Sequence, residues 1–307
     1  MTYSSGASFH GVKPRLSHFA ALLAGNAALA VGPWLVRLTD TGPVAAGFWR
    51  LALALPVLVL LAAWSGQPAG RLKGRTRWLA IAGGVVFALD LASWHIGIEL
   101  TRLANATLFG NSGSLILLVW GFVLWRRWPG RREWLAVGCA LGGAAILLGR
   151  SMEISLPTLI GDLFCLLAGL FYAVYLITLQ GARAKGGSWG LLVWVCLAGA
   201  PVLLVIAWLM KEPVLPSGPG GWWPVIALAI SSQLVGQGLL VFSLRHFPPL
   251  IIGLALLTQP AIAAIVGWVA FDEILGAADF TGMALLAGAL IVAKQTEPRV
   301  VAGKPGA

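Results

Sequence analysis

The chain has 307 residues, of which 59% are hydrophobic and only 10% are charged. Soluble globular proteins carry about a quarter charged residues, so this composition excludes an ordinary soluble domain and indicates a membrane protein. The formal net charge is +10, but the lysines and arginines are spread over short loops, which argues against nucleic-acid binding. Cys139, Cys165 and Cys196 lie in apolar runs without CxxC spacing, so we expect neither a disulfide framework nor a metal site.

A helix that crosses a bilayer needs roughly 20 apolar residues. The first apolar run is longer than the core of a signal peptide and leads directly into the next run, so we expect it to remain as the first helix. Runs bounded by charges, glycines and prolines predict ten membrane spans, at residues 18–37, 44–64, 78–98, 103–124, 134–149, 160–180, 189–210, 223–243, 250–271 and 279–294.

The positions of the basic residues support this layout. With ten spans, 16 of the 21 lysines and arginines fall on one side, and only Arg37, Arg50, Arg102, Arg150 and Lys211 fall on the other. Cytoplasmic loops are enriched in Lys and Arg, so both termini are predicted to be cytoplasmic. A missed or additional span in the middle of the chain would scramble this asymmetry.

The two halves of the chain are similar in sequence. Residues 120–125 align with residues 266–271, and Gly142 aligns with Gly288. Five spans per half is an odd number, so the second half must cross the membrane in the opposite sense to the first. The sequence therefore predicts an all-α membrane protein of two inverted five-helix repeats, residues 1–150 and 151–307, with a site near the midplane between them.

Two segments carry a resemblance to a known family. They are residues 43–50 (PVAAGFWR) at the start of the second span and residues 257–273 (LTQPAIAAIVGWVAFDE) in the ninth. Together with ten spans and the duplication, they resemble EamA-type members of the drug/metabolite transporter superfamily over nearly the whole chain. The first half departs from this pattern at two positions, where Ser114 aligns with Pro260 and Arg127 aligns with Glu273.

The resemblance implies a secondary transporter of the cell inner (plasma) membrane, not an enzyme. It would export small amphipathic metabolites by alternating access through a central cavity. Similarity to the aromatic amino-acid exporters implies neutral or aromatic amino acids as substrates. The alternative within the superfamily is a proton-coupled drug, metabolite or sugar-type carrier. The expected partners are the small-molecule substrate and the lipid bilayer, without nucleic acid, for a monomer or weak homodimer.

Ionisable side chains cost roughly 2.5–3.5 kcal/mol in the hydrocarbon core, so they usually face a cavity or a partner. Asp90 is the only carboxylate near the centre of a predicted span. It could bind a substrate ammonium, couple a proton, or pack as a protonated residue beside Trp94, one turn away. His95 could hydrogen bond to a substrate or act as a pH-sensitive gate, and the structural alternative is an interfacial histidine near Glu99.

Neutral polar side chains gather in the fourth, eighth and ninth spans, where they suit a substrate that is polar at one end and apolar elsewhere. Hydrogen bonding between helices is their alternative role. With the third span, these spans are expected to line the cavity. The neutral candidates for substrate binding are Asn111, Ser112, Gln233, Gln237, Thr258 and Gln259, with Tyr175 as an aromatic wall, beside Asp90, Trp94 and His95.

Three residues are candidates for gating. Arg50, just inside the outer end of the second span, could extend to the interface, or bind a substrate carboxylate or a gate acid such as Asp272 or Glu273. Pro260 removes a backbone hydrogen bond in the ninth span and predicts a kink. The predicted gate therefore consists of Arg50, Pro260 and Glu273.

An enzyme is the alternative of a different class. Residues 110–113 (GNSG) match the G-x-S-G pattern of intramembrane serine proteases, which pair the serine with a histidine on another helix. Ser112 lies well inside its span, whereas His95 lies near the end of its own, too far for the required hydrogen bond. No phosphate-binding or dinucleotide motif occurs in a suitable setting, so no cofactor is expected. A non-transporting membrane scaffold is a further alternative.

Overall fold

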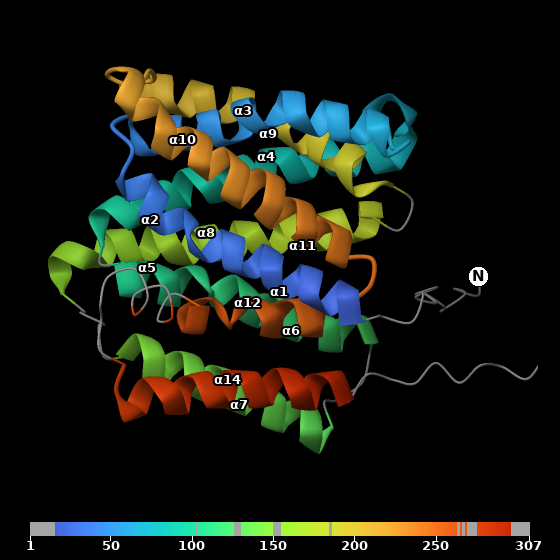
Figure 1. The fold of residues 1–307 in the computed structure, drawn as a ribbon, viewed down its shortest axis with the longest axis vertical. Helices are drawn as coiled ribbons and strands as arrows, with labels where there is room; N and C mark the ends of the chain where they lie inside the picture. The colour runs from blue at the N-terminus through green and yellow to red at the C-terminus, as the bar shows by residue number, and fades with distance from the viewer. Residues whose placement is uncertain are drawn as a thin grey trace, which may run out of the picture.

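The computed structural model describes residues 16–101, 103–125, 130–149, 155–183, 186–262 and 275–295, together with Ile265 and Trp268. Every regular element in these residues is helical, as predicted. The helices lie roughly parallel to one another and are stacked along the longest axis of the molecule (Figure 1).

The described helices overlap each of the ten predicted spans. In the first half they are α1 (Leu16–Ala30), α2 (Gly32–Arg37), α3 (Pro43–Trp64), α4 (Gly74–Leu100), α5 (Leu103–Gly110), α6 (Ser112–Trp125) and α7 (Arg131–Gly149). In the second half they are α8 (Leu156–Arg183), α9 (Ser188–Leu209), α10 (Trp222–Leu228), the π-helix η3 (Ala229–Gln237), α11 (Gly238–Ser243), α12 (Pro249–Leu256) and α14 (Ala277–Gln295).

Six helical segments of the described chain are long and apolar enough to cross a membrane, and three apolar helices are shorter. The long segments are Leu16–Arg37, Pro43–Trp64, Gly74–Leu100, Thr158–Arg183, Ser188–Leu209 and Pro219–Ser243. The count of ten spans and the orientation of the termini stay predictions.

Large apolar side chains cover the outside of these helices. Leu60 and Trp64 near the end of α3 are 70% and 89% exposed, and Trp208 and Leu209 at the end of α9 are 74% and 66% exposed. Exposing so much apolar surface to water is unfavourable, so this surface suits contact with lipid. Tryptophans at helix ends are typical of the membrane–water interface.

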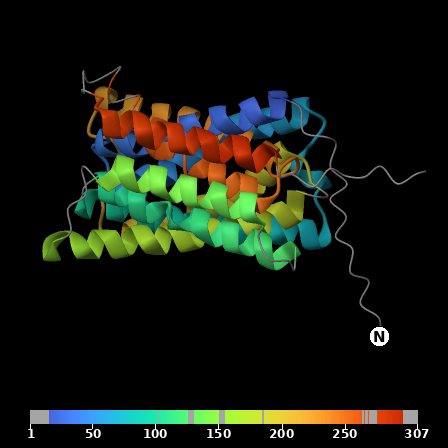
Figure 2. The same ribbon diagram turned by 90° about the horizontal axis from the view of Figure 1, so that it is seen from below.

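The packing of the helices reflects the duplication. α3 packs against α9, α6 against α12 and α7 against α14, and each pair joins corresponding spans of the two halves. α7 and α14 lie at the lower end of the molecule in Figure 1, and Figure 2 shows them side by side from below. The contact between α4 and α8 has its counterpart in the contact of α1 with η3 and α11. The contacts of one half therefore correspond to those of the other, as expected for two copies of one unit.

Four spans of the described chain are interrupted or distorted near their middle. α1 and α2 separate at Val31, α5 and α6 separate at Asn111, and η3 replaces part of the eighth span with π-helix. In the ninth span α12 ends at Leu256, and the Thr258 N–H donates to Ala255 O, 3.0 Å away, as in a 3₁₀ turn. Irregular backbone at membrane depth is tolerated where it is buried in protein or lines a cavity.

Candidate functional site

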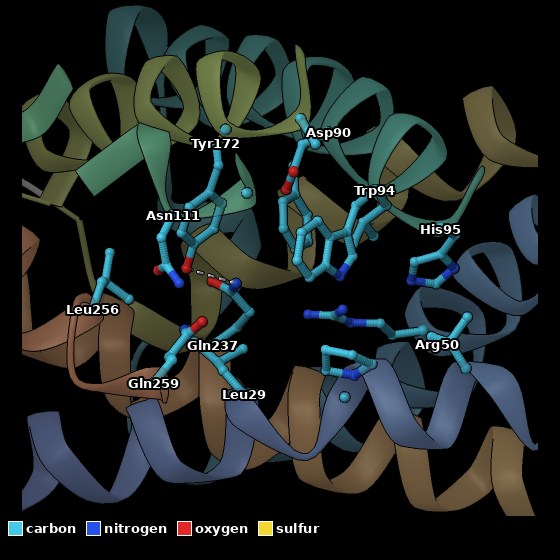
Figure 3. A pocket seen from close by; sticks show the side chains of 18 of the residues that line it. Leu29, Arg50, Asp90, Trp94, His95, Asn111, Tyr172, Gln237, Leu256 and Gln259 are labelled. Carbon is cyan, nitrogen blue, oxygen red and sulfur yellow. Dashed lines mark hydrogen bonds between the residues drawn. The ribbon is translucent and has the colours of Figure 1, made fainter. Parts of the chain in front are cut away.

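A cavity lies where these interrupted helices meet. The space inside it, including the open mouth, is about 670 Å³. The lining includes Leu29, Pro33, Arg50, Phe87, Asp90, Trp94, His95, Asn111, Ser114, Tyr172, Gln237, Leu256 and Gln259 (Figure 3). Both halves of the chain contribute to this wall.

The structure brings seven of the candidate residues to the cavity and places the others behind or away from it. Asp90, Trp94, His95, Asn111, Gln237, Gln259 and Arg50 line the cavity. Gln233, Tyr175 and Thr258 lie behind the wall, where they hydrogen bond to other polar groups. Ser112 packs against Gly169 of α8, and Pro260 is buried outside the lining. Asp272 and Glu273 lie outside the described residues.

Arg50 does not extend to the outer surface. It is 5% exposed, and its guanidinium points into the cavity (Figure 3). Nε donates to Gln233 Oε1 at 3.3 Å, and the guanidinium carbon lies 5.6 Å from the centroid of the Phe87 ring. Phe87 in turn stacks on Tyr175, with 4.4 Å between ring centroids. These contacts hold the arginine from behind and leave its terminal nitrogens directed at the cavity.

His95 is buried inside the protein and not exposed on its surface. The residue has no exposed surface, and its Nδ1 lies 2.7 Å from the carbonyl oxygen of Pro43 at the start of α3. A carbonyl oxygen only accepts, so Nδ1 carries the hydrogen, and Nε2 of the neutral ring is an acceptor. Nε2 has no hydrogen-bond partner among the described residues.

Asp90 lies one turn before Trp94 on α4 and is 7% exposed. Its carboxylate lines the cavity and makes no hydrogen bond or ion pair with any residue of the described chain. The positive charge of Arg50 interacts electrostatically with this carboxylate. We call Arg50, Asp90 and His95 the charged end of the cavity.

The opposite end of the cavity is polar but neutral. Asn111, Tyr172, Gln237 and Gln259 line it, and we call these four residues the neutral end. Gln237 Nε2 donates to the Tyr172 hydroxyl at 3.4 Å, and Gln237 Oε1 accepts from the Tyr175 hydroxyl at 3.1 Å. Asn111 Nδ2 donates to Thr107 O of α5 at 2.7 Å.

Asn26 of α1 joins the first span to the ninth behind the neutral end. It is fully buried, and its Nδ2 donates to Ala255 O and to Thr258 Oγ1, both at 2.7 Å. Its Oδ1 accepts from Gln259 Nε2 at 3.0 Å. Asn26 thereby adds a donor to a carbonyl that also accepts from the N–H and the hydroxyl of Thr258, at the point where α12 is interrupted.

Gly110 at the end of α5 allows Trp94 to reach the cavity wall. A Cβ atom at position 110 would overlap the indole ring of Trp94. The glycine is therefore required for the close approach of α5 to α4.

The comparisons with known proteins agree with this architecture. The sequence model of the EamA-like transporter family matches residues 16–149 and again residues 159–294. The chain belongs to the EamA-like transporter family. The EamA protein is therefore a multi-pass membrane transporter with two EamA repeats, as the sequence resemblance implied.

Individual relatives are distant. The EamA protein is 24% identical over 147 residues to an uncharacterized transporter of Archaeoglobus fulgidus, and the match spans 46% of this chain and about half, 49%, of that one. A solved crystal structure of a protein shares the fold with a TM-score of 0.78 at 16% identity, over 92% of this chain and 98% of the other. The predicted boundary between the repeats, at residues 150 and 151, lies outside the described residues.

Sequence reasoning underestimated the contribution of three spans to the site of this EamA protein. Leu29 and Pro33 come from the first span, Arg50 from the second and Tyr172 from the sixth. The adjacent Gly32 and Pro33 were an available signal, because they end the regular helix of the first span inside an apolar run. No local signal marks Phe87, whose role depends on its contact with Arg50.

The serine-protease arrangement does not occur in the described chain. Ser112 lies against Gly169, and the free nitrogen of His95 has no hydroxyl partner. A serine nucleophile needs its base within hydrogen-bond reach. The G-x-S-G segment instead contains the interruption between α5 and α6.

Proposed function

We propose that this protein exports small amphipathic metabolites, specifically neutral or aromatic amino acids, through the central cavity and across the inner (plasma) membrane. The observation that carries the proposal is the composition of the wall. Leu29, Leu256 and Trp94 supply apolar and aromatic surface, whereas Gln237 and Gln259 supply amides without charge. This mixture suits a ligand with an apolar side chain and a compact polar group.

The arrangement of the helices supports alternating access as the mechanism. The wall is built from interrupted spans of both halves, so a small rotation of one repeat against the other would change which mouth of the cavity is open. The hydrogen bonds of Asn26 to Thr258 and Gln259 connect the two repeats beside the cavity. In this proposal they are exchanged each time the protein changes conformation, with the repeats inverted and both termini cytoplasmic.

A proton-coupled carrier is the second candidate, because Asp90 is a buried carboxylate without a partner among the described residues. Such a group could take up a proton in one conformation and release it in the other. Asp90→Asn should then abolish the response of transport to a pH gradient while the protein stays folded. A facilitative exporter would show no such response in either form.

Counterflow uptake into proteoliposomes tests the proposed function. Labelled tryptophan, phenylalanine, threonine and a sugar are offered to the purified protein, with and without a pH gradient. Saturable uptake of the aromatic pair, but not of the sugar, is the expected result. Folded protein that takes up no amino acid would contradict the proposal and direct the search to sugars, nucleotides or drugs.

A further inference from the structure

The charged end of the cavity presents three groups that lack partners among the described residues. The terminal nitrogens of Arg50 donate to nothing, the carboxylate of Asp90 accepts from nothing, and Nε2 of His95 is an unpaired acceptor. All three residues are more than nine-tenths buried, at 5%, 7% and 0% exposure. Buried polar groups are normally paired, so this cluster indicates a ligand that supplies the missing partners.

The chemistry of the three groups defines that ligand. Arg50 offers only donors, and a planar guanidinium matches a carboxylate. Asp90 and the free nitrogen of His95 offer only acceptors, so they need N–H or O–H groups opposite them. An ammonium group has three N–H donors, which is enough for both acceptors. One ligand must therefore carry an anion and a donor-rich cation close together.

The balance of charge argues against a ligand with a single charge. Arg50 and Asp90 are the only formally charged residues among the described lining residues. A ligand with one charge would pair with one of them and leave an uncompensated net charge in a site of low dielectric, which is costly. A zwitterion satisfies both and adds no net charge.

We propose that the charged end is the head-group site for the zwitterion of an α-amino acid, with the carboxylate at Arg50 and the ammonium at Asp90 and His95. This assignment rests on the proposed function and specifies which residues bind the head group of its substrate. The side chain of the substrate extends toward the neutral end, where Leu29, Leu256 and Tyr172 lie opposite the head-group site (Figure 3).

Two residues of the head-group site, Arg50 and His95, are held in place before a ligand enters. Gln233 and Phe87 support Arg50 from behind, and the Pro43 carbonyl fixes the ring of His95 through Nδ1. Groups that need no rearrangement lose less conformational entropy on binding. Arg50 and Asp90 form no direct ion pair in the described chain, so a ligand does not have to break one.

The test uses three indole ligands that differ only at the head group. Tryptophan has both charges, tryptamine lacks the carboxylate, and indole-3-propionate lacks the ammonium. Binding to the full-length protein in detergent is measured by isothermal titration calorimetry. Wild-type protein should bind tryptophan about 10- to 100-fold more tightly than either analogue, as expected for a lost charge-assisted hydrogen bond.

Variants assign each charge to its residue. Arg50→Gln should weaken tryptophan binding by about 10- to 100-fold without weakening tryptamine, and Asp90→Asn should do the same without weakening indole-3-propionate. His95→Phe removes a neutral acceptor, so about a 2- to 10-fold loss is expected for both ammonium ligands. Arg71→Gln and Asp40→Asn remove the same charges outside the cavity and serve as matched controls.

The outcomes separate this inference from the proposed function. Discrimination by head group in binding, without transport, would support the site and contradict the export function. Transport of tryptophan with equal affinity for all three ligands would contradict the site alone. If Asp90→Asn removes the pH response but preserves the preference for tryptophan over indole-3-propionate, Asp90 carries a proton and the assignment is wrong. Because the wild-type comparison needs no variant, a variant that fails to fold does not remove the test.

Discussion

The polar groups at the two ends of the cavity differ in their hydrogen bonding. At the neutral end, Gln237 and Gln259 use their amides to bond other side chains, including Tyr172 and Asn26. At the charged end, the carboxylate of Asp90 has no partner among the described residues.

This difference separates groups that stabilise the fold from groups that are available to a ligand. A buried hydrogen-bonded network makes the packing of its helices specific, and breaking it leaves unsatisfied atoms. Unpaired buried groups give no such stabilisation and are retained at functional sites. Substitutions at the neutral end should therefore reduce stability, and substitutions at the charged end should change ligand selectivity.

The largest effect on stability is expected at Asn26, behind the neutral end. Asn26→Ala removes three hydrogen bonds and leaves Gln259 Nε2 without its acceptor, at a cost of about 1–3 kcal/mol for that group, whereas Ala255 O keeps the N–H and the hydroxyl of Thr258 as donors. Thermal unfolding in detergent measures the loss. Asp90→Asn, at the charged end, should leave the midpoint unchanged, and an equal loss in both variants would remove the distinction between the two ends.

A similar effect is expected where α5 meets α4. Gly110→Ala places a Cβ atom on the ring of Trp94 and should destabilise the protein by about 1–3 kcal/mol through overpacking. Trp94→Ala in the same protein removes the overlap, so the double variant should be more stable than the sum of the two single changes predicts. Additive losses in the unfolding midpoint would show that the two residues are not in contact.

A smaller effect on binding is expected at Gln237. Gln237→Ala removes the hydrogen bonds to the Tyr172 and Tyr175 hydroxyls, so the cavity wall beside the substrate side chain loses this support. Because the lost hydrogen bonds join protein side chains and not the ligand, tryptophan binding should weaken by no more than about 10-fold, while the preference for tryptophan over tryptamine is preserved. Loss of that preference would place the head group at the neutral end.

The smallest effect is a pH dependence far from the cavity. Burial lowers the pKa of His246 below its ordinary value, although the bond from Nδ1 to Phe242 O acts in the opposite direction. The stability that depends on neutral His246 is present above the ordinary histidine pKa of about 6.5 and is lost as the pH falls through that value.

Its test is the unfolding midpoint at several pH values. His246 packs against His18, with 4.0 Å between ring centroids, so His246→Phe keeps a ring in this contact but cannot be protonated. The variant should lose less stability than wild type on acidification from about pH 7.5 to 5.5. An identical slope in both proteins would assign the acid sensitivity to other groups.

The sequence by itself determined the class of the protein and the position of its helices along the chain. The helices could be located because a helix that crosses a bilayer needs a long apolar run, whatever it packs against in the fold. The duplication was visible for the same reason, since both repeats place glycines and apolar residues at matching positions. The sequence also identified Asp90, His95 and Gln237 as unusual, because polar groups in apolar runs stand out.

Only the tertiary structure decided which of these polar groups face the cavity and which support it. Helical periodicity tells which residues share a face of one helix, but rotation and depth depend on partners far away in the chain. Arg50 is held by Gln233, 183 residues later, and Asn26 by Gln259, 233 residues later. Such contacts leave no local pattern, so the separation into a charged end and a neutral end arises from the packing of the two repeats.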